Sequence, residues 1–272
     1  RGRLEPAHPG GGAAPELARR RSAARRTPRR PIEVVNWTNE EGSRFPPAMF
    51  ASGVWAGAHD VETAYETTDA DGVRFVDALE GIGYRGDVPA EPTHEYDSYL
   101  ELHVEQGPYL DDAGADVGVV EGIVGFRWAE LTFEGQADHS GTTPMHARQD
   151  ALVAAADVVT AARRIPGTLG ERTVGTCGVI EARPGSINVV PGEVSLTCGF
   201  RDPDDEVVAR ADERIRAEAA AAAEREGVAW SYEPRMRVGS VDFADRAVAA
   251  VQAAADAGGH ESLRLTSGAG HD

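Results

Sequence analysis

The pattern of apolar and polar positions in the first half of the chain predicts two strands, a loop and a helix. Residues 32–36 form a short apolar run, which is typical of a buried strand. Residues 99–105 alternate between apolar and polar side chains and predict a half-buried strand. The polar segment 38–45 predicts a loop, and apolar residues at every third position over 73–82 predict an amphipathic helix.

The second half of the chain repeats a pattern of strands and helices. Its order of strand, helix, strand, strand, helix is typical of a split βαβ unit. The strands are expected at 129–134, 173–181 and 193–200, the helices at 148–164 and 204–225, with a further helix at 245–257 and a glycine hinge at 122–125. Asp202 or Asp204 is expected to cap the longest helix, and Gly227 to end it.

Composition narrows the function classes. The 272 residues carry a net charge of -18, and all 27 basic residues are arginine. Such an acidic surface repels nucleic acid and anionic membranes. The sequence contains no apolar run long enough for a transmembrane helix, no signal peptide and no CxxC pair. These features predict a cytoplasmic globular protein.

Residues 1–30 differ sharply from the rest of the chain. They hold nine arginines and two acids, a net of +7, against 18 arginines and 43 acids, a net of -25, in the remainder. A disordered basic tail, a targeting peptide and a non-native reading frame are the alternatives. The lack of an amphipathic apolar face argues against the targeting peptide.

Two polar segments carry carboxylates and imidazole where metal chemistry needs them. Glu40 and Glu41 are adjacent on the predicted loop, so one could bind a metal while the other takes a proton from water. His103 lies on the polar side of the predicted strand 99–105. Taken singly, a solvated acidic loop and a structural histidine are the more common explanations.

Three further segments offer groups that could bind substrate. His139 stands among small and turn-forming residues, and Asn188 lies between two Pro-Gly turns. Arg201, near a strand end, could clamp a carboxylate through its forked guanidinium, although a surface salt bridge is the plainer alternative. A glycine-rich turn, Gly268-Ala269-Gly270-His271-Asp272, ends the sequence.

Taken together and in order, these motifs resemble the N-carbamoyl-L-amino-acid hydrolase and allantoate amidohydrolase branch of the M20 superfamily. The resemblance implies an α/β, zinc-hydrolase-like catalytic domain with two divalent metal ions (Zn, Mn or Co) and an inserted ferredoxin-like α+β lid that makes a homodimer. It implies a catalytic domain at 31–121 and 237–272, and a lid at 122–236. The implied substrate is a small ureido acid, such as an N-carbamoyl amino acid, allantoate or β-ureidopropionate.

The resemblance also implies a role for each matched residue. Glu40 corresponds to the general base, Glu41 and His103 to metal ligands, and Gln106 to a substrate contact. The matched lid residues, which bind substrate in part across the dimer and stabilise the developing oxyanion, are His139, Asn188 and Arg201.

The sequence departs from this family at both ends. Residues 1–30 contain neither the His-x-Asp motif nor the Phe-Asp-Gly-type segment expected upstream of the Glu-Glu loop. The family's last histidine ligand lies beyond a segment like 268–272. Residues 1 to about 28 are therefore expected to come from a shifted reading frame and the C-terminus to be truncated. Gly199 stands where the family often has an acid.

Two other functions stay open on the sequence alone. One is a catalytically inactive remnant whose lid still dimerises, because Glu41 and His103 alone cannot hold a hydrolytic zinc. The other is an M20 peptidase or deacylase, against which the segments 105–108 and 139–145 argue.

Overall fold

The computed structural model describes residue 19 and residues 27–272, so the prediction of a basic N-terminal segment falls largely outside the described residues. The chain divides into two compact units. Unit 1 comprises residues up to Asp112 together with Gly270–Asp272, and unit 2 comprises Ala113–Ala269. No described helix is long and apolar enough to cross a membrane.

Over residues 27–112, unit 1 has short helices around a small aromatic core. The helices are α2 (Phe50–Trp55), α3 (Val61–Glu66) and α4 (Phe75–Gly81), and α5 (Tyr109–Ala113) follows where the unit ends. Asp60 caps α3 by accepting a hydrogen bond from the Thr63 amide. The core side chains are Phe45, Phe50, Ala64, Phe75 and Leu79.

The predicted helix over 73–82 is therefore confirmed in shortened form, and two predicted strands are wrong. Residues 32–36 and 99–105 form no strand, and their apolar side chains are exposed, with Val34 at 65% and Leu100 at 79%. An alternating or apolar sequence becomes a strand only when another strand pairs with its backbone groups. Among the described residues no strand pairs with either segment.

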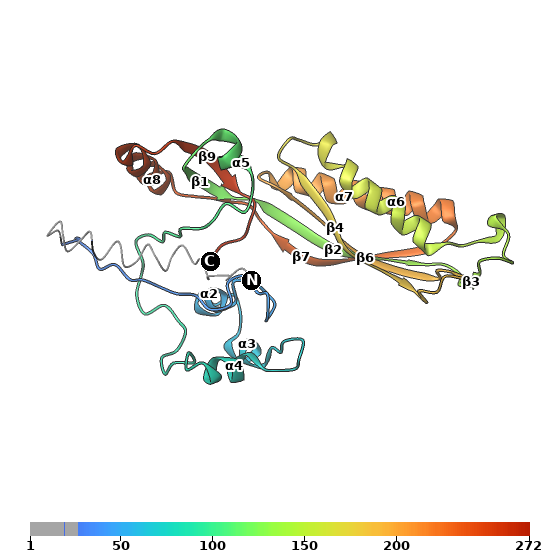
Figure 1. Cartoon of the computed structure of the whole chain (residues 1–272), viewed down its shortest axis with the longest axis horizontal. Helices are drawn as coiled ribbons and strands as arrows, with labels where there is room; N and C mark the ends of the chain where they lie inside the picture. Colours follow the sequence, from blue (N-terminus) through green and yellow to red (C-terminus); the bar gives the residue numbers. More distant parts are fainter. Residues whose placement is uncertain (1–18, 20–26) are drawn as a thin grey trace, which may run out of the picture. The chain divides into compact units, whose positions relative to one another are not determined.

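Unit 2 contains a four-stranded antiparallel sheet (Figure 1), which includes the three predicted strands and a fourth, at Ala229–Val238, that was not predicted. Its strand order is β4-β6-β2-β7, built from β2 (Gly125–Glu134), β4 (Val174–Arg183), β6 (Glu193–Asp202) and β7 (Ala229–Val238). With a helix after the first and third strands, this is the ferredoxin-like topology. The expected ferredoxin-like α+β fold is confirmed.

Helices α6 (Ala151–Arg164) and α7 (Asp205–Glu226) cover one face of this sheet (Figure 1). Asp150 caps α6, Asp204 caps α7, and Gly227 ends α7 in a left-handed conformation at φ 66°. Asp204 and Gly227 confirm the predicted ends of the longest helix, α7. The core between the layers has 19 buried residues, of which nine are alanines, so the helices approach the sheet closely.

The helical side of the sheet also buries two carboxylates, those of Asp202 and Asp212. Asp212 of α7 is 6% exposed and accepts a hydrogen bond from the Tyr232 hydroxyl. Arg127 and Arg216 approach its carboxylate to 3.5 and 3.2 Å. Burial, and then the bond to this carboxylate, raise the pKa of Tyr232 above its ordinary value.

The remaining elements of unit 2 are a second sheet and a short ladder. The second sheet, ordered β8-β1-β9, consists of β1 (Val117–Ile123), β8 (Val241–Asp242) and β9 (Ser262–Ser267), and α8 (Asp245–Gly258) packs on it. The predicted helix 245–257 is thereby confirmed. The ladder pairs β3 (Asp138–His139) with β5 (Val189–Val190), and 3-10 turns lie at Met145–Ala147 and Pro166–Thr168.

Candidate functional site

The loop that carries Glu40 and Glu41 is held by its own backbone. Asn39 adopts a left-handed conformation at φ 58°, and its side-chain amide donates to the carbonyl of Phe45 at 2.6 Å. The amide of Met49 donates to the carbonyl of Glu40 at 2.6 Å. A side chain on Gly42 would lie 2.5 Å from the Ala48 nitrogen, so only glycine fits this turn. The predicted loop is confirmed, and it presents both carboxylates from one rigid turn.

His103 meets these carboxylates within unit 1. Ligand atoms of Glu40, Glu41 and His103 all lie within 4.8 Å of one another. His103 Nδ1 lies 2.6 Å from the carbonyl oxygen of Val104, which can only accept, so Nδ1 carries the proton. The unprotonated Nε2 therefore faces Glu40, 3.9 Å from its Oε1, and is the atom free to bind a metal.

The environment of Glu40 differs from that of an ordinary surface carboxylate. Its side chain is 18% exposed. Burial, and then the negative charges of Glu41 and Asp272, raise the pKa of Glu40 above its usual value, while His103 opposes the shift. A carboxylate with a raised pKa is better suited to accept and return a proton near neutral pH.

Two residues that had no predicted role also reach His103. Ligand atoms of Glu101, His103 and His271 form a second group within 4.8 Å, and His271 Nδ1 lies 3.5 Å from Glu101 Oε1. Burial acts to raise the pKa of Glu101, but bonds from His271 and Tyr99 outweigh it and the pKa is lowered. Glu101 could have been found from the sequence, because it lies two residues before His103. His271 lies in the glycine-rich segment 268–272, but nothing in that segment indicates that it meets His103.

This donor set fits a divalent transition metal. Carboxylate oxygen and imidazole nitrogen are the ligands such ions take. Tetrahedral bonds of about 2.1 Å separate ligand atoms by about 3.4 Å, so groups spread over at most 4.8 Å need to close by at most about 1.4 Å. Side-chain rotation supplies that movement.

Gln106 lies beside the same cluster. Its backbone is left-handed at φ 57°, and its side-chain amide donates to Glu41 Oε1 at 3.2 Å. Glu105, next to it, accepts the amides of Tyr109 and Leu110 and so fixes the start of α5. Four predicted residues, Glu40, Glu41, His103 and Gln106, are thus brought together in unit 1.

His139 and Asn188 come together in unit 2 through the β3–β5 ladder. The amide of Ser140 donates to the carbonyl of Asn188 at 2.9 Å, and the Asn188 side chain pairs with the Ser186 hydroxyl. The amides of Gly141 and Thr142 donate to His139 Nδ1 at 3.1 and 3.2 Å. Neutral His139 is therefore protonated on Nε2, which can donate to an oxyanion.

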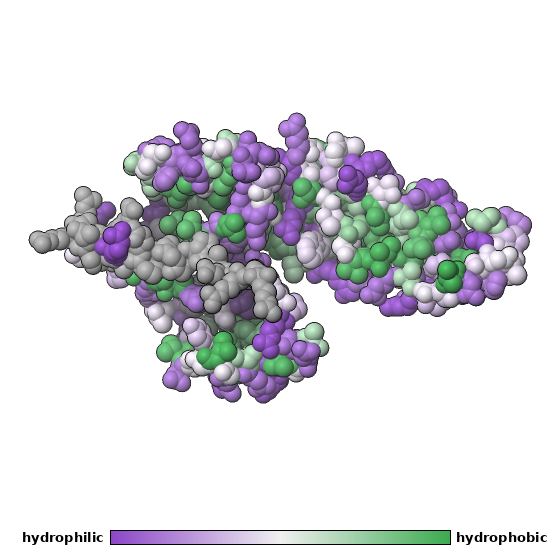
Figure 2. Space-filling model, viewed as in Figure 1, coloured by the Kyte–Doolittle hydropathy of each residue, from purple (hydrophilic) through white to green (hydrophobic). Residues whose placement is uncertain are grey.

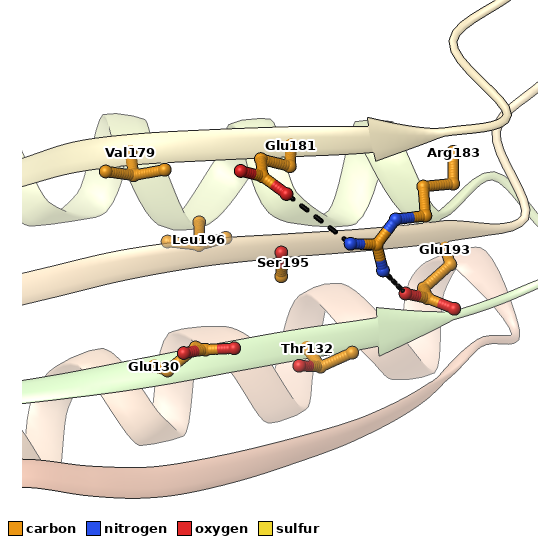
Figure 3. A pocket seen from close by; sticks show the side chains of 8 residues that line it. All are labelled: Glu130, Thr132, Val179, Glu181, Arg183, Glu193, Ser195 and Leu196. Carbon is orange, nitrogen blue, oxygen red and sulfur yellow. Dashed lines mark hydrogen bonds and ion pairs between the residues drawn. The ribbon is translucent and has the colours of Figure 1, made fainter. Parts of the chain in front are cut away.

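Arg201 lies apart from that pair. It is near the end of β6, whereas Asn188 precedes the start of β6. The eight residues from Glu193 to Arg201 span about 26 Å of extended strand. The Arg201 guanidinium donates to the Gly268 carbonyl at 2.7 Å, and burial lowers its pKa. A polar hollow of about 260 Å³ lies on the same sheet and is lined by none of the predicted site residues (Figure 3).

Matches to known proteins extend over both units. Residues 122–227 match a family model described as a peptidase dimerisation domain. The chain is 41% identical over 244 residues to an N-carbamoyl-L-amino-acid amidohydrolase of Rhizobium meliloti, and 36% identical over 182 residues to the allantoate amidohydrolase of Escherichia coli. These matches cover 89% and 66% of this chain, and 58% and 44% of the relatives.

Solved structures agree with these sequence matches. The fold matches a crystal structure of an amidase of the hydantoinase/carbamoylase family from Burkholderia multivorans with a TM-score of 0.83 and 41% identity. The match covers 94% of this chain and 62% of that one. The chain thus spans about three-fifths of the length of the Rhizobium meliloti and Burkholderia multivorans proteins.

Proposed function

The chain belongs to the hydantoinase/carbamoylase family of amidohydrolases, and from that premise we propose that it hydrolyses the C–N bond of a ureido group in a small carboxylic acid. The substrates in view are N-carbamoyl amino acids, allantoate and β-ureidopropionate. The observation that carries the proposal is the cluster of Glu40, Glu41 and His103, whose ligand atoms lie within 4.8 Å of one another.

The divalent metal, which is zinc, manganese or cobalt in this proposal, is held by Glu41 and His103. The proton on Nδ1 of His103 and the Gln106 amide on Glu41 orient both ligands. A bound divalent ion supplies a water of lowered pKa and polarises the ureido carbonyl.

Glu40 is proposed to move the proton. Its carboxylate stands next to the ligands but is a separate side chain, so it is free to take a proton from the attacking water. Its raised pKa then allows it to return that proton to the leaving nitrogen. Water adds to the ureido carbon, the C–N bond breaks, and ammonia, carbon dioxide and the amino acid are the products when an N-carbamoyl amino acid is the substrate.

The residues of unit 2 are proposed to recognise the substrate. His139 Nε2–H and the Asn188 amide are donors for the oxygen that becomes negative as water adds. Arg201 pairs with the carboxylate of the substrate. The described residues place no carboxylate within ion-pairing distance of this guanidinium, so its charge is available to a ligand.

We also propose a homodimer through unit 2, which the same geometry supports. About 26 Å of β6 separates Asn188 from Arg201, which is more than a ureido acid can span. Both can serve one substrate only if they come from different copies of the chain. The match to a dimerisation domain supports this pairing. Apolar surface over the helical layer, with Val153 of α6 at 45% exposure, offers a contact face (Figure 2).

The test is turnover by the full chain loaded with zinc, manganese or cobalt. Ammonia release is measured from N-carbamoyl amino acids, allantoate and β-ureidopropionate, and release of the free amino acid is measured from dipeptides and N-acetyl amino acids, the competing substrates of a peptidase or deacylase. We expect release from the ureido acids alone, and a loss of about 10²–10⁴ in rate in Glu40→Gln with metal content unchanged. The exposed Glu95→Gln is the matched control.

Three outcomes contradict the proposal in different ways. Preferred cleavage of dipeptides or N-acetyl amino acids assigns the chain to the peptidase or deacylase class. Metal binding without any turnover removes the catalytic claim and leaves the alternative of a dimerising protein. Full activity in Glu40→Gln refutes the role of Glu40 as the base.

A further inference from the structure

The sheet face that carries Arg201 is divided into an apolar half and a polar half. This is the face opposite α6 and α7, because Arg201 alternates with the core residue Phe200 along β6. In the register of the sheet, Phe126 lies opposite Arg201, and Trp128 lies opposite Gly199. On β7 the neighbours of these two aromatic residues are Val238 and Met236, which are 41% and 43% exposed.

The other half of the face is polar. It carries the hollow of Figure 3, whose lining includes Glu130, Glu181, Arg183 and Glu193. Arg183 pairs there with Glu181 and with Glu193. Charged groups at that end thus satisfy one another, whereas the guanidinium of Arg201 lies beside the aromatic rings of Phe126 and Trp128.

Trp128 lies flat enough on the sheet to cover Gly199. A Cβ atom on Gly199 would lie 2.5 Å from Trp128 Cδ1 and 2.9 Å from its Nε1, so any side chain there would displace the indole. Trp128 nevertheless remains 47% exposed. The glycine that departs from the family pattern therefore makes room for a large aromatic surface beside the arginine.

The same rings hold the guanidinium in place. Arg201 Cζ lies 5.1 Å from the centre of the Phe126 ring and 5.8 Å from that of Trp128, and the two rings are 6.1 Å apart. Such contacts are attractive through the electrons of the ring face. The Gly268 carbonyl accepts from Nη1 at 2.7 Å, and no other hydrogen bond to this guanidinium occurs in the part of the chain that the structure describes. Several of its five N–H groups stay available for a carboxylate.

We propose that Phe126, Trp128 and Gly199 form a side-chain subsite beside Arg201, and that the preferred substrate is a 2-ureido acid with an apolar side chain. This inference rests on the proposed function, because it assumes that Arg201 holds the substrate carboxylate. Trp128 supplies the contact surface, and Gly199 keeps that surface against the sheet.

The distances suit this arrangement. A carboxylate paired with a guanidinium places its carbon about 4 Å from Cζ, and the α-carbon about 1.5 Å farther. The side chain of a 2-ureido acid branches from that α-carbon, within reach of rings whose centres are 5.1 and 5.8 Å from Cζ. Desolvation of an apolar group on the indole face is favourable.

All the candidate substrates share a ureido group and a carboxylate, so these groups cannot discriminate between them. The side-chain subsite can. N-carbamoyl-L-phenylalanine presents a phenyl group to Trp128. N-carbamoylglycine has no side chain, and allantoate carries a second polar ureido group instead. Partial burial of the phenyl group predicts about tenfold tighter binding than that of N-carbamoylglycine.

The test measures binding, apart from turnover. Dissociation constants for N-carbamoyl-L-phenylalanine, N-carbamoylglycine and allantoate are obtained by calorimetry on the zinc-loaded full chain carrying Glu40→Gln, which prevents hydrolysis during the titration. Trp128→Ala and Gly199→Ala are compared with this parent, with Trp128→Phe as the conservative control. Thermal melts check that each variant is folded, as expected for a half-exposed indole.

We expect the parent to bind the phenyl compound about tenfold more tightly than the other two ligands. This preference should fall below about twofold in Trp128→Ala and to an intermediate value in Gly199→Ala. Trp128→Phe should keep the preference of the parent. Arg201→Ala should weaken all three ligands alike. Equal binding of the three ligands by the parent, or a preference that survives Trp128→Ala, overturns the subsite while the proposed function stands. If no ureido acid binds, the proposed function fails and the subsite with it.

Discussion

Replacing His103 by glutamine should remove the metal from this protein. His103 is the residue common to both candidate ligand groups, with Glu40 and Glu41 on one side and Glu101 and His271 on the other. Its Nε2 is the ligand atom, because the bond from Nδ1 to the Val104 carbonyl fixes the tautomer. No other single substitution weakens both groups.

The magnitude follows from the number of ligands. Structural zinc sites with four ligands bind with about 10–16 kcal/mol, which is about 2.5–4 kcal/mol for each ligand. The loss of His103 as a ligand is then worth about 100-fold or more in affinity. Glu41→Gln should weaken zinc by at least about tenfold and Glu101→Gln by less than about threefold, if Glu41 is the ligand and Glu101 mainly orients its neighbours.

Zinc affinity is measured by competition with a fluorescent chelator, and the metal content by mass spectrometry after dialysis. His260→Gln, at a 54% exposed histidine of unit 2, is the matched control and should bind as the parent does. Unchanged affinity in His103→Gln refutes the reasoning. A larger loss in Glu101→Gln than in Glu41→Gln would move the metal to the group that contains His271.

Three predictions concern the stability of unit 2. Phe133→Ala, at a fully buried position, should lower the free energy of unfolding by about 3–5 kcal/mol in urea titrations, and a loss below about 1 kcal/mol would contradict its place in the core. Asp150→Ala removes the cap of α6 and should cost about 1 kcal/mol in the same assay, whereas Asp150→Ser should restore most of it; an equal loss in both variants would argue against capping. The pKa of Tyr232 is raised, so its contribution to stability is complete below its unfolded pKa of about 10 and is lost as the pH rises through the folded value. Melting temperatures above about pH 10 should therefore fall more steeply for the parent than for Tyr232→Phe, and parallel curves would refute this account.

The sequence was sufficient where local rules decide the structure. Asp204 and Gly227 mark the ends of α7 through capping and a left-handed turn, which need no distant partner. The strand predicted at 193–200 was found as β6 (Glu193–Asp202). The order of strand, helix, strand, strand, helix was therefore predicted, whereas the fourth strand, β7, was not.

The sequence was insufficient where the outcome depends on distant residues. Segments 32–36 and 99–105 carry strand-like patterns, but a strand also requires a pairing partner, which their own composition does not report. The meeting of His271 with Glu101, 170 positions earlier, has no local signature. Nor could the departure at Gly199 be explained until Trp128 was seen to lie over it.

The alanine-rich interface between the helices and the sheet sets the direction in which this fold can tolerate genetic change. Nine of its 19 core positions have a single methyl group, so little volume can be lost there, while added carbon must push a helix away from the strands at about 1–3 kcal/mol per substitution. Most one-base changes of an alanine codon give a larger residue, valine and threonine among them. Random mutation therefore acts on this layer mainly by expansion, and a substitution library over α6 and α7 should retain Ala→Ser far more often than Ala→Ile. Selection against larger residues therefore preserves such a core, whereas substitutions in a leucine-rich core destabilise it mainly by creating cavities.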